Sequence, residues 1–65
     1  MSDDQDKVDG HRRHIRDHIE KHKQYKDDRD KQTMVKQIQN TQREIGDLKK
    51  KNPRISDSYE DSWTP

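Results

Sequence analysis

The stretch that decides the fold is MVKQIQNTQREIGDL, residues 34–48 of this 65-residue chain. Its hydrophobic side chains recur at spacings of four and three residues, with one threonine at the centre: Met34, Ile38, Thr41, Ile45 and Leu48. Such spacing is typical of the heptad seam of a helix that packs against another helix. We therefore predict that these five residues form an interface with a protein partner or with a second copy of the chain.

Good helix-forming residues continue on both sides of this seam. Between Gly10 and Pro53 the chain contains no proline and a single glycine. Asn52 precedes that proline and marks a helix stop, because the residue before proline avoids the α region. The sequence predicts an all-α, coiled-coil-like protein with three parts: a flexible acidic tail (1–10), a basic helical rod (11–51) and a flexible acidic-aromatic tail (52–65).

Two helical arrangements fit residues 11–51. Ile15 and Ile19 lie outside the heptad register of Ile38, but an 11-residue repeat brings the aliphatic residues onto one side of a single long helix. Alternatively, the aspartate-rich residues 27–30 break the rod, because aspartate favours helix caps over helix interiors, and the two pieces fold back as a hairpin. No glycine or proline marks a turn there, so we expect the single helix rather than the hairpin.

The composition limits what such a helix can do alone. Eight residues are leucine, isoleucine or valine, and there is no cysteine. Burying so few aliphatic side chains does not offset the entropy of ordering the chain, so order is expected to come from association rather than from a compact monomeric core. A chain without a core cannot form a water-excluding pocket, so we expect no enzyme activity, no cofactor and no small-molecule substrate.

No segment is apolar enough for a transmembrane helix or for the core of a signal peptide. We therefore expect an intracellular protein, cytoplasmic or inside an assembled particle, that is not secreted and does not bind membranes. These features predict a small accessory or assembly protein. It would become ordered by self-association or by docking on a larger cellular or viral complex.

Charge is distributed unevenly along the chain and suggests an alternative partner. Residues 1–10 carry four acids and one lysine, residues 11–54 carry fourteen basic and seven acidic residues, and residues 55–65 carry three acids and no base. Basic side chains can bind the phosphates of nucleic acid without reading its sequence. The candidates for association with nucleic acid or a nucleoprotein lie in the basic segment 11–26: Arg12, Arg13, Arg16, Lys21, Lys23 and Lys26.

Four histidines follow one side of the predicted helix: His11, His14, His18 and His22. Histidines one turn apart can chelate a divalent ion, and protonating all four in mild acid would add positive charge to one face. A metal or pH sensor is therefore a third, less favoured function. Because three of these side chains span two helical turns, one ion cannot reach them together, and no metal ligands are assigned.

The acidic-aromatic tail holds a second possible binding motif. Ile55, Tyr59 and Trp63 are spaced by four residues and would share one face of a short helix, with Asp57 and Glu60 as a capping pair. Tyrosine and tryptophan are typical anchors of protein interfaces. We predict that Tyr59 and Trp63 dock on a protein partner, with folding back of the tail onto the basic rod as the alternative.

Overall fold

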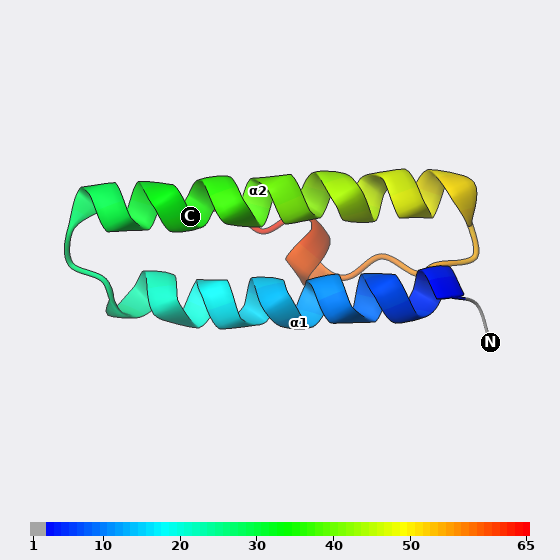
Figure 1. Cartoon of the computed structure of the whole chain (residues 1–65), viewed down its shortest axis with the longest axis horizontal. Coiled ribbons are helices and arrows are strands. Elements are labelled where there is room, and N and C mark those ends of the chain that lie inside the picture. Colours follow the sequence, from blue (N-terminus) through cyan, green and yellow to red (C-terminus); the bar gives the residue numbers. More distant parts are fainter. Residues whose placement is uncertain (1–2) are drawn as a thin grey trace.

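The computed structural model describes residues 3–65, which form a two-helix hairpin closed by the C-terminal tail (Figure 1). Helix α1 (Asp3–Gln24) is followed by helix α2 (Asp28–Lys51) and by a short 3₁₀ helix, η1 (Tyr59–Asp61), with no strand among the described residues. The molecule is a rod of 40 × 16 × 15 Å. The predicted all-α class is confirmed. Of the two arrangements, the hairpin is observed, and the expectation of one long helix is wrong.

The turn between the helices is made by the aspartate cluster. Helix α1 ends at Gln24, and Asp27 adopts an extended conformation as the N-cap of α2. Its carboxylate accepts a hydrogen bond of 2.8 Å from the backbone N–H of Arg29. Lys21 and Lys23 lie in the last turn of α1, where cations complement the helix dipole. Aspartate capping thus ends one helix and begins the next without glycine or proline, so the turn carries neither of the residues that usually mark one.

The ends of the helices fall partly outside the predicted rod. Helix α1 begins at Asp3 rather than near residue 11, so most of the acidic segment expected to be a flexible tail is the first third of a helix. Its aspartates are favourable there because the N-terminal end of a helix dipole is positive; Met1 and Ser2 lie outside the described residues. The predicted stop is confirmed, since α2 ends at Lys51 and the Asn52 N–H donates to the Leu48 carbonyl at 2.9 Å.

The core is one layer of aliphatic side chains between the helices. Ile15 and Ile45 are fully buried, and the cluster as a whole comprises Val8, Ile15, Ile19, Ile38, Ile45 and Ile55. This corrects the expectation that a single chain forms no compact core. Ile15 and Ile38 belong to different helical registers because they lie on different helices. The two helices face each other, and the apolar stripe of each covers that of the other.

The tail (residues 52–65) returns along the hairpin, and η1 lies between α1 and α2 in contact with both (Figure 1). Ile55 joins the core and Trp63 packs against it. The tail is therefore not a free, flexible segment, and the fold-back alternative is the one observed. Because only residues 59–61 are helical, Tyr59 does not share a face with Ile55 and remains 61% exposed.

Neither helix of residues 3–65 is long and apolar enough to cross a membrane.

Candidate functional site

A cluster of ion pairs fastens the tail to both helices, and Asp61 is its centre. The Arg12 guanidinium of α1 donates through Nε to Oδ1 of Asp61 at 3.0 Å and through Nη2 to Oδ2 at 2.8 Å. The Lys49 ammonium of α2 donates to the same Oδ2 at 3.0 Å. The side chains of Arg12 and Asp61 are only 11% and 10% exposed. One carboxylate of the tail thus bridges the two helices.

Glu60 provides a second attachment beside the first. Its side chain is buried and lies 3.3 Å from Nη1 of Arg16, and it accepts a hydrogen bond from the Ser58 hydroxyl. On the α2 side, Nε2 of Gln42 donates to the carbonyl oxygens of Glu60 (3.0 Å) and Trp63 (2.9 Å). The tail is therefore held by side chains of both helices, and the buried side-chain nitrogen and oxygen atoms of its described residues all have partners.

These contacts shift the ionisation of the cluster. Burial alone would raise the pKa of Asp61, but the hydrogen bonds from Arg12 and Lys49 outweigh it and lower that pKa. Burial would likewise raise the pKa of Glu60, and the Ser58 hydrogen bond together with the nearby guanidinium groups lowers it. Hydrogen bonds to Asp57 and Asp61 raise the pKa of Lys49. All these shifts favour the charged forms that the cluster requires.

We expect the protein to lose stability in acid because of these two carboxylates. A carboxylate whose pKa is lower in the folded state stabilises the fold at pH values above its unfolded pKa. That contribution disappears as the pH falls through the folded pKa, so the loss should begin at about pH 4.5 and continue below it. Urea denaturation followed by Trp63 fluorescence at pH 7, 5, 4 and 3 measures the effect.

Two controls sharpen this test. The Asp61→Asn variant lacks one of the titrating groups, so its free energy of unfolding should depend less on pH below 4.5. If instead the wild-type protein loses its stability between pH 7 and 5, where both carboxylates stay ionised, the histidines and not the tail cluster would control the acid response.

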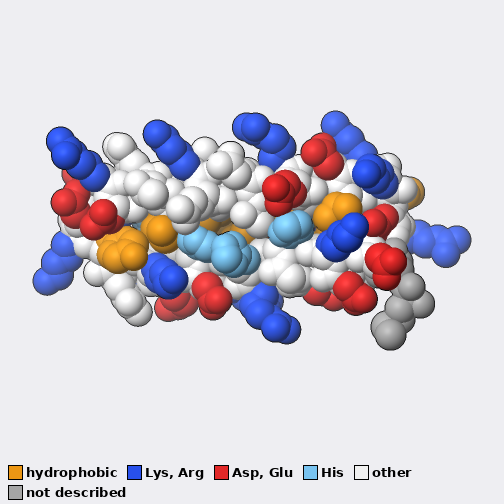
Figure 2. All heavy atoms as spheres, viewed as in Figure 1, with side chains coloured by type: hydrophobic (Ala, Val, Ile, Leu, Met, Phe, Trp, Pro, Cys, Tyr) orange, Lys and Arg blue, Asp and Glu red, His pale blue; other side chains and the backbone are white. Residues whose placement is uncertain are grey.

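The tail covers only one flank of the hairpin, because its attachment points lie on one side of the core. The opposite side, which we call the open flank, is marked by the contact of His11 Nε2 with Glu44 Oε2 at 3.5 Å. Helical periodicity places three α1 histidines and three half-buried α2 residues there: His11, His14, His18, Met34, Thr41 and Leu48. Figure 2 shows histidine and hydrophobic side chains along the boundary between the two helices.

The four histidines of α1 differ in their burial and in their contacts. His18 is buried, and its Nδ1 lies 2.8 Å from the His14 carbonyl oxygen, so Nδ1 carries the hydrogen and donates it. The rings of His14 and His18 lie 4.4 Å apart, and His22 meets the edge of Trp63 at 5.5 Å. Within residues 3–65, no group of three or more potential ligands is arranged to hold a metal ion.

The predicted partner-interface residues are divided by the fold into three groups. Ile38 and Ile45 lie in the core of the same chain, and Trp63 packs against that core. Met34, Thr41 and Leu48 form a half-buried line on the open flank. Tyr59 is exposed on η1, at the tail. The seam is thus a real helix-packing surface, but its two central isoleucines are covered within the chain.

The six predicted nucleic-acid candidates do not lie on one face. Arg12 and Arg16 are bound by the tail carboxylates, and Lys23 lies 3.6 Å from Glu20. Arg13 lies on the outer side of α1, where periodicity also places Asp17 and Glu20. Lys21 and Lys26 are exposed near the turn. The basic segment of the sequence is therefore a mixed-charge surface in the fold.

Sequence reasoning missed the polar edges of the open flank. On α1, three exposed residues repeat at intervals of seven and carry basic or imidazole groups: Lys7, His14 and Lys21. On α2, another exposed set repeats at the same interval and includes two acids: Asp30, Gln37 and Glu44. The seven-residue spacing is visible in the sequence, but only the hairpin shows that the two rows border the same flank.

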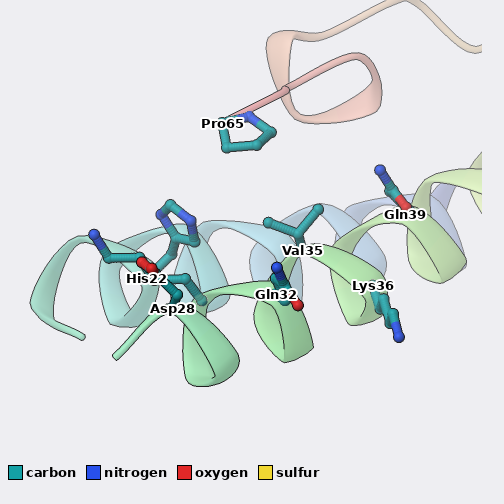
Figure 3. Close-up of a pocket in the computed structure, with 8 residues that line it drawn as sticks. His22, Asp28, Gln32, Val35, Lys36, Gln39 and Pro65 are labelled. Carbon is teal, nitrogen blue, oxygen red and sulfur yellow. The ribbon is translucent and has the colours of Figure 1, made fainter. Parts of the chain in front are cut away.

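An open depression of about 460 Å³ lies beside α2, under the last residue of the chain (Figure 3). Figure 3 shows Pro65 above Val35, with His22 and Asp28 at one end. None of the four groups with a shifted pKa, which are Arg12, Lys49, Glu60 and Asp61, lines this depression. Its lining includes four ionisable side chains, those of His22, Asp28, Lys31 and Lys36.

No family model matches this chain, and no curated protein or solved structure is significantly similar to it.

Proposed function

We propose that this chain is a small, non-enzymatic assembly protein that pairs with a second copy of itself through the open flank. The observation that carries the proposal is the half-buried line of Met34, Thr41 and Leu48, which the tail leaves uncovered. Leu48 already packs against the core, and the Thr41 hydroxyl donates to the Gln37 carbonyl at 3.0 Å. A helix of a second copy that packs against Met34, Thr41 and Leu48 would extend the core, and the Thr41 hydroxyl that it buries already has a hydrogen-bond partner.

Charge complementarity supports a second copy as the occupant. A two-fold axis parallel to the helices places α1 of one copy opposite α2 of the other, and the same residues meet twice. The edge with Lys7 and Lys21 would then face the edge with Asp30 and Glu44. Like charges would be kept apart, and the four helices would form an antiparallel bundle.

The proposal is tested by sedimentation equilibrium over a hundredfold range of concentration. The expected result is a mass that rises from the 7.9 kDa of one chain toward twice that value. Lys7→Glu or Glu44→Lys alone should raise the dissociation constant at least tenfold, and both together should restore association. Glu44→Lys also removes the contact of Glu44 with His11 at 3.5 Å, so the helix content of each variant is checked by circular dichroism to separate loss of association from unfolding.

A matched control is Arg13→Glu, which makes the same charge change on the outer side of α1. This variant should associate like the wild-type protein. If the chain remains a monomer at every concentration, self-association is wrong, and the open flank would be left for docking on a different protein. If Arg13→Glu is as harmful as Lys7→Glu, net charge and not the open flank controls assembly.

A further inference from the structure

A straight row of cations runs along the solvent-facing side of α2, opposite the core. It consists of four exposed residues at seven-residue intervals: Arg29, Lys36, Arg43 and Lys50. Seven residues are close to two helical turns, so the row drifts by only about 20° per interval. At 1.5 Å per residue it extends over about 32 Å. Figure 2 shows Lys and Arg side chains projecting along the edge of the molecule that α2 forms.

These four cations are not used by the fold. The ion pairs of residues 3–65 engage His11, Arg12, Arg16, Lys23 and Lys49, and none involves the row. Lys36 borders the depression under Pro65, but its side chain stays exposed, and no tail carboxylate pairs with the row. Helical periodicity places the row opposite the core and outside the open flank, so neither the ion-pair cluster nor dimerisation would cover it. A line of solvated, unpaired charges on a rigid helix is a surface available to an anion.

The side chains between the cations indicate which kind of anion fits. They are amides and a hydroxyl: Gln32, Thr33, Gln39 and Asn40. Val35 is half-buried beside Lys36 and Gln39 in the depression under Pro65. A single valine is not the continuous apolar face that a membrane-bound helix inserts into lipid. Protein interfaces concentrate their energy in buried aromatic and aliphatic anchors, and this row offers none. Amides, hydroxyls and basic side chains are the groups that contact nucleic-acid phosphates and sugars.

We infer that the outer face of α2 binds the phosphate backbone of duplex nucleic acid, without reading its sequence. A duplex is favoured over a single strand because single-strand binders stack bases on aromatic side chains. The three aromatic residues lie off the row, Tyr25 in the turn and Tyr59 and Trp63 on the tail. The major groove, about 12 Å wide, accommodates an α-helix of about 10–12 Å diameter. Asp47 lies one helical turn from both Arg43 and Lys50, and its carboxylate would repel a phosphate bound by these two cations.

The test uses fluorescence anisotropy of a labelled 24-base-pair DNA duplex at several salt concentrations. Four phosphate contacts predict a slope of log K against log salt of about −3.6, so affinity should fall about 150-fold between 50 and 200 mM salt. Replacing the four cations of the row by glutamine should weaken binding at least tenfold at 50 mM salt. Asp47→Asn should strengthen it about threefold, with the helix content of each variant checked by circular dichroism.

A second quadruple variant separates the row from net charge. It replaces four exposed cations outside the row and the open flank, Arg13, Lys23, Lys26 and Arg54, by glutamine, and so removes the same charge. This variant should bind the duplex within threefold of the wild-type protein. An equal loss in both variants, or no binding by the wild-type protein at 50 mM salt, overturns the inference. Tighter binding to labelled polyglutamate or to phosphatidylserine vesicles than to the duplex also overturns it, in favour of an acidic protein or a lipid surface.

Discussion

Replacing Ile45 by alanine is expected to remove about 3 kcal/mol from the free energy of unfolding. Ile45 is fully buried in a core of only six aliphatic side chains, so the cavity has few neighbours that can move to fill it. A domain of this size has about 3–5 kcal/mol of stability from a single hydrophobic core, and most of it would be lost. Urea denaturation monitored by circular dichroism at a fixed protein concentration measures the change.

Lys36→Ala is the matched control for this experiment. It lies on the exposed side of the same helix, and lysine and alanine are both good helix formers, so the change should stay within about 0.5 kcal/mol of wild type. Equal stability of Ile45→Ala and Lys36→Ala would contradict the intrachain core. It would support the expectation from the sequence that Ile45 is buried only by association.

Replacing Asp61 by asparagine is expected to release the tail before the helices unfold. The change keeps the shape of the side chain but leaves the Arg12 guanidinium, which is 11% exposed, without its charge partner. Breaking a fully buried pair costs about 3–5 kcal/mol, and partial exposure reduces this to about 2 kcal/mol. Because Trp63 is the only tryptophan and packs on the core, its emission should shift to longer wavelength at a lower urea concentration than the helix signal is lost.

Asp57→Asn separates this effect from a general loss of negative charge. Asp57 also pairs with Lys49, but its side chain is 89% exposed, so its removal should cost less than about 0.5 kcal/mol. If the two asparagine variants behave alike, or if the fluorescence and helix transitions of Asp61→Asn still coincide, the tail is not held by the buried pair.

Much of the fold can be predicted from the sequence, and the wrong prediction of a single long helix has a definite physical cause. Residue composition identified the helical region, and periodicity identified the stripe of Met34, Ile38, Ile45 and Leu48. The proline after Asn52 identified the helix stop. Periodicity could not decide between one helix and two, because a break made by aspartate capping resembles a weak point in a continuous helix. The register conflict between Ile15 and Ile38 was evidence for the hairpin, since two helices that face each other do not share a register.

The candidate surfaces were harder to predict, because they depend on pairs of residues far apart in the chain. Arg12 and Asp61 are separated by 49 positions, and no local sequence pattern predicts their contact. The open flank likewise requires knowing that the side of α1 with His11 faces the side of α2 with Glu44. The cation row on α2 has a clear seven-residue period, but the segment 11–26 has the higher local density of basic residues and directed the prediction to α1.

Because Asp61 contacts both helices, its position determines the order in which the parts of the chain fold. Helix formation and the closing of a three-residue turn involve neighbours in sequence and proceed within microseconds, whereas the tail must find partners on two different helices. Its docking site does not exist until α1 and α2 lie side by side, so the tail is expected to attach last and detach first. Trp63 therefore reports completion of the fold, and a stopped-flow refolding trace should show its signal lagging behind the gain of helix.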